Sequence, residues 1–137
     1  MEIRQSDLKS PYLKQLYKMF LKVWDHVDAF EETKNGLELP YPILALEEGD
    51  LIGGLSFTAY QHPDKDQMAL WINALYVDRA FRGKHVASNL ISYAEEKARE
   101  MGYTEILVYT DLASLYLKLG YKSLSYNGSH TVLLKTL

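Results

Sequence analysis

The chain has 137 residues, of which 47% are hydrophobic and 24% charged, values that suit one globular domain over residues 1–137. Its formal net charge is −3, so it lacks the basic excess of a sequence-independent nucleic-acid binder. The absence of cysteine excludes disulfides, thiolate nucleophiles and cysteine-ligated zinc, and agrees with a reducing, cytoplasmic compartment. No apolar run approaches the roughly 18 residues of a membrane span, so no membrane partner is expected.

The N-terminal part of the chain predicts a strand followed by an amphipathic helix. Residues 2–5 read as a short strand. Ser10 and Pro11 are typical of a helix start, with serine as the N-cap and proline at the first helical position. Apolar residues then recur every three to four positions as far as Val27, which indicates one apolar helix face. The polar, irregular segment 28–40 leaves room for a second short helix.

The middle of the chain predicts three strands. Segments 41–47 and 51–60 are apolar runs joined by a Glu-Gly-Asp turn, which is typical of a hairpin. Gly53 and Gly54 lie early in the second of these strands, where glycines indicate a bulge or a close backbone approach. The third run, 68–77, is long and rich in aromatic residues, and we expect it at the centre of the sheet.

The C-terminal half alternates helices and strands. Segment 84–101 is the clearest helix, because its apolar residues line one face and Gly102 follows as a C-cap. After it we expect a buried strand, a short helix and two strands around an Asn-Gly hairpin turn, at 105–110, 112–119, 121–126 and 130–136. This order indicates an α/β fold of the mixed α+β type, with helices packed on one sheet.

The segment 75–88, which reads LYVDRAFRGKHVAS, carries the clearest chemical signal. A strand ends there, and a basic turn leads into the predicted helix. Helix N-termini expose unpaired N–H groups and partial positive charge, which attract phosphate. Arg82 and Lys84 add full charges, and Gly83 lets the backbone approach an anion. Because the segment has neither a P-loop ending nor the three glycines of a dinucleotide fold, it is either a phosphate cradle of another kind or a basic surface turn.

This stretch resembles motif A of the GCN5-related N-acetyltransferase (GNAT) superfamily, whose pattern is Arg/Gln-x-x-Gly-x-Gly/Ala. Residues 82–87 read RGKHVA, with His85 where the family has glycine. Downstream, residues 115–121 read LYLKLGY and resemble the family's Phe-Tyr-Glu-Lys-Leu-Gly-Phe motif. Residues 71–77, WINALYV, are similar to the strand that precedes motif A in some members. The two motifs stand at the family's usual separation, which predicts a member of this superfamily.

The resemblance implies a central, mostly antiparallel sheet of about six to seven strands with helices on both faces. It further implies that strand 68–77 splays from strand 105–110, and that the pantetheine arm of acetyl-CoA enters the gap. The backbone of Leu75, Tyr76 and Val77 would bind that arm like an added strand. The alternative for Leu75 and Val77 is core packing of their side chains. Both roles are compatible, since binding of the pantetheine arm requires only their backbone atoms.

The same resemblance assigns the remaining contacts to acetyl-CoA. Backbone N–H groups from the basic turn and the helix start would hold the pyrophosphate, namely those of Arg82, Gly83, Lys84, His85, Val86, Ala87 and Ser88. Asp111 follows strand 105–110, where many relatives place an asparagine that meets the cofactor. The alternative for Asp111 is the N-cap of the next helix.

The implied reaction is attack of an amine on the thioester of acetyl-CoA in a ternary complex. The amine must first lose a proton, and the attack creates an oxyanion that needs a preorganised hydrogen-bond donor. The resemblance implies the backbone N–H of Leu75 as that donor and the Tyr116 hydroxyl as the acid that protonates the leaving thiolate. The alternative for Tyr116 is an aromatic residue on a helix face.

The sequence does not identify a general base. Many family members have a glutamate on the strand before motif A, where this chain has Asn73. The candidates by residue type alone are Asp25, His26, Glu47, His62 and Asp66. An ordered water, or an amine that arrives deprotonated, are further alternatives. The histidines show no metal-ligand spacing, so no metal is predicted.

Two functions therefore stay open. One is an N-acetyltransferase acting on a small amine, such as a polyamine or an aminoglycoside, or on a peptide N-terminus. The acidic balance favours a cationic acceptor, and Trp24, Tyr60 and Trp71 are candidates for its pocket, with core packing as the alternative. The other is a non-catalytic acetyl-CoA-binding sensor, which His85 and the missing glutamate allow. The resemblance leaves a homodimer open.

Overall fold

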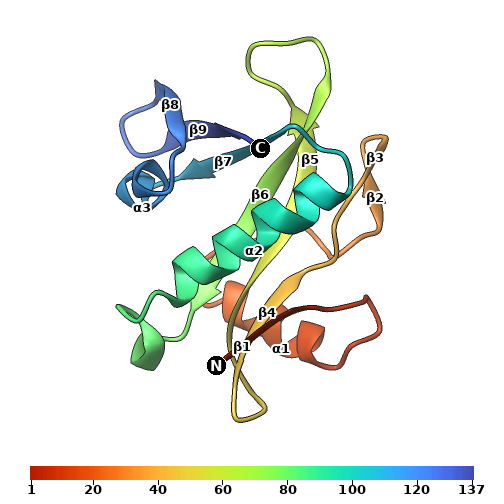
Figure 1. The fold of residues 1–137 in the computed structure, drawn as a ribbon, viewed down its shortest axis with the longest axis vertical. Coiled ribbons are helices and arrows are strands. Elements are labelled where there is room, and N and C mark those ends of the chain that lie inside the picture. The colour runs from red at the N-terminus through yellow and green to blue at the C-terminus, as the bar shows by residue number, and fades with distance from the viewer.

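A computed structural model describes residues 1–137 and contains one seven-stranded sheet in the order β1-β4-β5-β6-β7-β9-β8 (Figure 1). Its strands are β1 (Glu2–Gln5), β4 (Ile43–Glu47), β5 (Asp50–Gln61), β6 (Met68–Val77), β7 (Glu105–Thr110), β8 (Lys122–Tyr126) and β9 (Thr131–Thr136). Every neighbouring pair is antiparallel except β6 with β7, which is parallel. The prediction of a mostly antiparallel mixed α/β sheet is confirmed.

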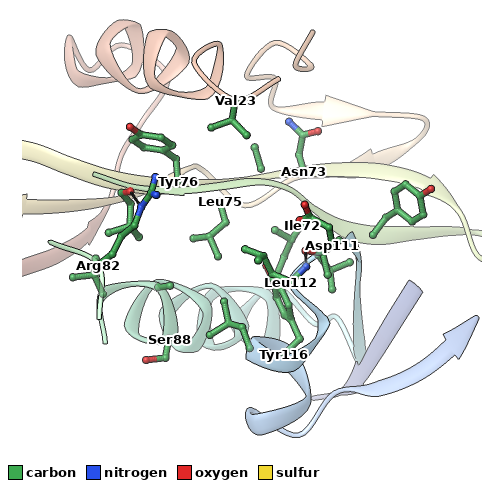
Figure 2. Close-up of a pocket in the computed structure, with 18 of the residues that line it drawn as sticks. Val23, Ile72, Asn73, Leu75, Tyr76, Arg82, Ser88, Asp111, Leu112 and Tyr116 are labelled. Atoms are coloured by element: carbon green, nitrogen blue, oxygen red, sulfur yellow. Dashed lines mark hydrogen bonds between the residues drawn. The ribbon is translucent and has the colours of Figure 1, made fainter. Parts of the chain in front are cut away.

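Helices cover both faces of this sheet, as expected. α1 (Tyr12–Phe20) packs on one face, while α2 (Val86–Glu100) and the short α3 (Ala113–Lys118) lie on the other (Figures 1 and 2). Successive residues of a strand point to opposite faces, so β4, β5 and β6 contribute to a core cluster on each side. A 3₁₀ turn at Arg79–Phe81, which the sequence did not predict, links β6 to α2.

The segment after α1 departs from the prediction. α1 ends at Phe20, not near Val27, and segment 28–40 contains no helix. It forms instead a small hairpin of β2 (Thr33–Lys34) and β3 (Leu37–Glu38). An Asn-Gly pair supplies the left-handed turn, with φ of 50° at Asn35 and 83° at Gly36.

Tertiary contacts explain why this segment is not helical. Asp28 Oδ2 accepts hydrogen bonds from Lys34 Nζ and from Thr58 Oγ1, the latter at 2.9 Å. Asn35 Nδ2 donates to the backbone oxygen of Ala59 at 2.8 Å. Both contacts tie the segment to β5, and they need the extended hairpin geometry that a helix would not supply.

The two glycines of β5 serve a close backbone approach. A Cβ at Gly53 would lie 2.4 Å from the Tyr76 carbonyl oxygen, and one at Gly54 would lie 2.6 Å from the Leu16 side chain. The β4–β5 register also shifts next to Ala45, which pairs with Gly53. Both parts of the sequence interpretation, the bulge and the close approach, are confirmed.

β6 and β7 separate soon after they meet. They pair only at Trp71 and Ile72 of β6, although β6 continues to Val77 and β7 to Thr110. Asn73 is an extra residue in the β5–β6 ladder, because the register shifts there, and such a bulge bends a strand. The expected splay between 68–77 and 105–110 is therefore present, and it begins at Asn73.

Candidate active site

A cavity of about 640 Å³ occupies the gap between the splayed strands (Figure 2). Val23 and Trp24, which follow α1, line it on one face of the sheet. Ala87 and Ser88 at the start of α2, and Tyr116 of α3, line it on the other. The cavity therefore passes through the sheet and is reached from both faces.

The free edge of β6 presents backbone groups to this cavity. The N–H of Asp78 donates to the carbonyl oxygen of Ile52 in β5 at 2.7 Å, so the backbone groups of Asp78 face β5. Peptide groups alternate along a strand, so those of Leu75 and Val77 face the gap. In agreement, Val77 O accepts a hydrogen bond from Arg82 Nε at 2.9 Å. The N–H groups of Leu75 and Val77 and the Leu75 carbonyl are thus available to an extended ligand.

The start of α2 supplies unpaired donors on the same cavity wall. His85 is the N-cap residue and makes no side-chain capping hydrogen bond. The N–H groups of Val86, Ala87 and Ser88 have no protein acceptor, whereas Asn89 N–H donates to His85 O at 3.0 Å. A 15-residue helix adds partial positive charge at this end, so the wall suits an anion.

The turn before α2 is left-handed at two positions. Gly83 has a φ of 78°, and His85 has φ 65° and ψ 16°. Glycine takes this conformation without cost, which gives a physical reason for the glycine of the family pattern at the place of His85. For an ordinary L-residue the left-handed region costs about 1–2 kcal/mol. His85 therefore keeps the turn but strains it.

The two basic side chains of the turn differ in whether they line the cavity. Arg82 donates to Val77 O, and its guanidinium lies 5.8 Å from the Tyr76 ring centroid, so it lines the cavity. Lys84 Nζ lies 5.5 Å from the Phe81 ring centroid, and Lys84 does not line the cavity. All other site residues named from the sequence do: Leu75, Tyr76, Val77, Arg82, Gly83, His85, Val86, Ala87, Ser88, Asp111 and Tyr116.

Tyr116 is buried beside Tyr121, with edge-to-face rings 5.2 Å apart, and borders the cavity. Its hydroxyl is not engaged by any protein hydrogen bond in this structure. Burial raises the pKa of Tyr116 well above the usual tyrosine range. The phenol therefore stays protonated at neutral pH and can act as a proton donor. Core packing and a role in the cavity are both compatible with this position.

For Asp111, the alternative interpretation as a helix N-cap is wrong. The N-cap of α3 is Leu112, and its N–H is bound at 2.9 Å by Thr110 Oγ1. Asp111 is exposed, makes no protein hydrogen bond and lines the cavity. Its carboxylate is thus free to meet a ligand.

None of the base candidates chosen by residue type lines the cavity. His62, for example, is buried with Nε2 3.3 Å from Glu105. Asn73 does line it, but its amide donates to Ser56 Oγ at 3.2 Å. The sequence interpretation missed Tyr109 and His130, which line the cavity side by side. The only sequence signal in that region is the Asn-Gly turn before His130, and this turn predicts a hairpin and not a functional site.

The three aromatic candidates for an acceptor pocket lie in different places in the structure. Trp24 lines the cavity where it opens on the α1 face. Trp71 is buried, with Nε1 donating to Tyr60 O at 3.3 Å, and Tyr60 is exposed elsewhere. Of the three, the fold brings only Trp24 to the cavity.

A splayed sheet, a through-sheet cavity and a helix start with free N–H groups define the class of fold, and the sequence agrees with it. The family model of the acetyltransferase (GNAT) family matches residues 6–121, so the chain belongs to this family. The recognition made from the two motifs is confirmed. With it are confirmed the fold class and the membership of a family of acetyltransferases.

Solved structures of similar fold span nearly the whole chain. An aminoglycoside 6'-N-acetyltransferase complexed with coenzyme A has a TM-score of 0.74 at 18% identity, covering 99% of this chain and 97% of that one. The NatC complex bound to Gag peptide and CoA gives 0.72 at 18%, covering 100% and 99%. The ribosomal-protein-alanine N-acetyltransferase from Brucella melitensis gives 0.70 at 14%, covering 100% of both.

These identities establish a shared fold. The chain has no significant match among the curated proteins. No helix is long and apolar enough to cross a membrane. No group of three or more histidine, aspartate or glutamate side chains is placed to hold a metal ion.

Proposed function

We propose that the chain is an N-acetyltransferase that moves the acetyl group of acetyl-CoA to a primary amine of a small molecule or peptide. The main observation in support is the cavity that passes through the sheet, with a free strand edge and a helix N-terminus on its walls. Such a cavity lets two substrates enter from opposite faces and meet at the gap. Direct attack in a ternary complex follows from that arrangement.

In this proposal acetyl-CoA enters from the α2 face. Its pantetheine arm lies along β6 and bonds to the backbone of Leu75 and Val77, next to Tyr76. Its pyrophosphate takes the free N–H groups from Val86 to Ser88, with Arg82 adding charge. The carboxylate of Asp111 lies at the other side of the gap.

The chemistry needs a donor for the oxyanion and a proton for the sulfur. The N–H of Leu75 faces the gap just beyond the bulge, where the thioester carbonyl would lie. The buried hydroxyl of Tyr116 protonates the departing thiolate. The first group belongs to β6 and the second to α3, so the fold places them before the reaction begins.

The acceptor enters from the α1 face, past Val23 and Trp24. The net charge of −3 favours a cationic amine. Proteins of similar fold include an aminoglycoside acetyltransferase and a complex bound to a peptide. We propose a cytoplasmic, single-domain enzyme over residues 1–137, without nucleic acid or membrane as a partner, and a homodimer as the assembly to check by light scattering.

The test is a calorimetric titration with acetyl-CoA on wild type, Arg82→Ala and Lys84→Ala. We expect micromolar binding by wild type and a loss of about 10-fold or more in Arg82→Ala, because charge-assisted contacts contribute about 1.5–3 kcal/mol. Lys84→Ala, a matched loss of charge outside the cavity, should change affinity much less. Turnover is then measured with spermidine, kanamycin and a short peptide with a free N-terminal alanine.

A non-catalytic acetyl-CoA sensor is the second candidate. It is favoured by Asn73, an amide where many relatives have a glutamate base, and by the strained His85. Tight acetyl-CoA binding with no transfer to any amine of the panel would support the sensor. Transfer to one of them would exclude it. No binding by wild type would overturn both functions.

A further inference from the structure

One pair of side chains in the cavity has no role in the reaction described so far. Tyr109 of β7 and His130, which precedes β9, stack with ring centroids 4.8 Å apart and an interplanar angle of 23°. Both line the cavity. Tyr109 is about half exposed, and His130 is partly buried.

Strand alternation places this pair on the α1 face of the sheet. Val108 belongs to the core cluster that contains α2, so its neighbour Tyr109 points to the opposite face. His130 stacks on Tyr109 and therefore lies on that face too. Tyr116 lies in the cluster that contains α2. The proposed acid and this histidine are thus on opposite faces, with the gap between them.

A hydrogen-bond network at the Asn-Gly turn holds the histidine. The Oδ1 atom of Asn127 accepts from the backbone N–H groups of Ser129, at 3.3 Å, and of His130, at 2.9 Å. These two donors fix which end of the amide is oxygen. The amide nitrogen of Asn127 donates to the Tyr109 hydroxyl, so one side chain braces both members of the stack.

The same network selects the tautomer of His130. Ser129 Oγ lies 3.4 Å from Asn127 Oδ1, which can only accept, so the hydroxyl donates to it. Ser129 Oγ then accepts from His130 Nδ1, at 3.0 Å. With the proton on Nδ1, the second ring nitrogen, Nε2, carries a free lone pair, and it makes no protein hydrogen bond.

We propose that His130 is the general base of acetyl transfer, and this assignment rests on the function proposed above. The acceptor reacts as a neutral amine on the α1 face. As its nitrogen forms the N–C bond to the thioester carbonyl, Nε2 of His130 takes one N–H proton. The C–S bond then breaks, and the thiolate takes a proton from Tyr116. The proton on His130 passes to solvent, and Tyr116 regains one, so the sum is amide plus CoA thiol.

One rival remains among the groups that line the cavity with His130. His85, the other histidine of the cavity wall, is the N-cap of α2 and so lies on the face opposite His130. Tyr109 faces it from β7, and its hydroxyl is occupied by Asn127. Asp111, from the loop after β7, is the one carboxylate on the cavity wall. Val23 and Trp24, on the α1 side, carry no charge. A carboxylate can also accept a proton, so Asp111 must be tested beside His130.

The experiment measures kcat/KM against pH for the best acceptor of the panel. The acceptor concentration is taken as that of its neutral amine at each pH, so that ionisation of the amine does not itself produce an acidic limb. The proteins compared are wild type, His130→Gln, His130→Ala, Asp111→Asn and Ser129→Ala. His26→Gln is the matched control, because His26 is exposed and outside the cavity. Acetyl-CoA affinity is measured for each variant by calorimetry. It reports that the fold and the cofactor site are intact, independently of turnover.

We expect His130→Gln to lower kcat/KM by about 100-fold or more, with acetyl-CoA affinity within about twofold of wild type. The acidic limb of the wild-type pH profile should disappear in this variant, and added imidazole should partly restore His130→Ala. Ser129→Ala should lose part of the rate, because the tautomer is no longer selected. A merely structural role would not produce the imidazole rescue or the loss of the limb.

Other results would overturn the assignment. Wild-type turnover without an acidic limb, or a limb that survives in His130→Gln but is lost in Asp111→Asn, would remove His130 as the base. A wild type that binds acetyl-CoA yet acetylates no amine would overturn the proposed function, and His130 as a base with it. Full turnover by His130→Gln would overturn the base alone.

Discussion

Among single residues, burial and backbone conformation decide what each polar side chain near the cavity can do. Tyr116 is removed from water, so its neutral form is favoured and it is a donor. Asp111 stays exposed and lines the cavity. His85 is exposed, but its backbone is held in a region that glycine prefers. These three positions were all marked by the sequence, and only their environments separate their roles.

We expect Tyr116→Phe to lower kcat by about 10²–10⁴-fold, the usual range for loss of a general acid. The ring stays in place, so acetyl-CoA affinity and thermal stability should hardly change. Because burial raises the pKa of Tyr116, its ionisation should not limit activity at or below pH 9 in wild type. Steady-state kinetics across pH checks both points. A variant with full activity would leave Tyr116 as a packing residue.

His85→Gly tests backbone strain apart from chemistry. Relief of the left-handed conformation should gain about 1–2 kcal/mol, less about 0.5–1 kcal/mol for the greater flexibility of glycine in the unfolded chain. We therefore expect a small net increase in the free energy of unfolding, measured by urea denaturation without ligand. Weaker binding of acetyl-CoA by the more stable variant would indicate that the imidazole itself contacts phosphate.

Among the elements, two features build the cavity: a strand pair that opens and a segment that folds over its far side. The bulge at Asn73 turns β6 away from β7. The segment after α1 is held to β5 by Asp28 and Asn35, which fixes the wall that Val23 and Trp24 form. Both features depend on contacts between distant parts of the chain.

The Asp28 contact should make stability depend on pH. Its hydrogen bond from Lys34, above all, lowers the pKa of Asp28 in the folded state. The stabilisation is therefore fully present above the unfolded value of about 3.9 and is lost as pH falls through the lower folded value. We expect Asp28→Asn to reduce the unfolding free energy by about 1 kcal/mol at pH 7, and by less at pH 3. Urea titrations at both pH values check this, and an equal loss at both would contradict it.

The close contacts at β5 predict unequal costs for two similar substitutions. A methyl group at Gly53 would meet the Tyr76 backbone oxygen, which cannot move without shifting β6. At Gly54 the nearest atoms belong to the Leu16 side chain, though Ile43 O lies 2.8 Å away. We expect about 1–3 kcal/mol of destabilisation for each variant, larger for Gly53→Ala. Gly49→Ala is not a suitable control, because its φ of 84° adds strain, so wild type is the reference.

For the molecule as a whole, ligand binding and stability should be coupled. Acetyl-CoA would contact β6, α2 and the loop before α3 at once, so only the folded chain can bind it. At about 100 times its Kd it should add about 2.7 kcal/mol to the unfolding free energy, seen as a rise in Tm. S-acetylpantetheine, which lacks the pyrophosphate, should raise Tm far less at equal concentration. Equal shifts would contradict the assignment of the α2 start as the phosphate site.

Much of the fold followed from local patterns in the sequence. The helical period of 84–101, the apolar run of 68–77 and the Asn-Gly turn at 127–128 each predicted an element close to the observed one. The end of α1 and the hairpin at 33–38 were missed, because contacts with β5 outweigh the apolar period that continues to Val27. The Asn-Gly pair at 35–36 was the signal that could have found this hairpin.

The sequence by itself determined the family and marked the basic turn before α2 as the expected phosphate site, because both depend on residues that are adjacent in the chain. Only the tertiary structure decided which polar groups share the cavity. It brought His130 and Tyr109 to the face opposite Tyr116, and it left Asp25, Glu47 and His62 outside. The residues that line the cavity come from elements that are distant in the sequence and meet only in the folded sheet. Their spacing along the chain therefore does not predict which of them share the cavity.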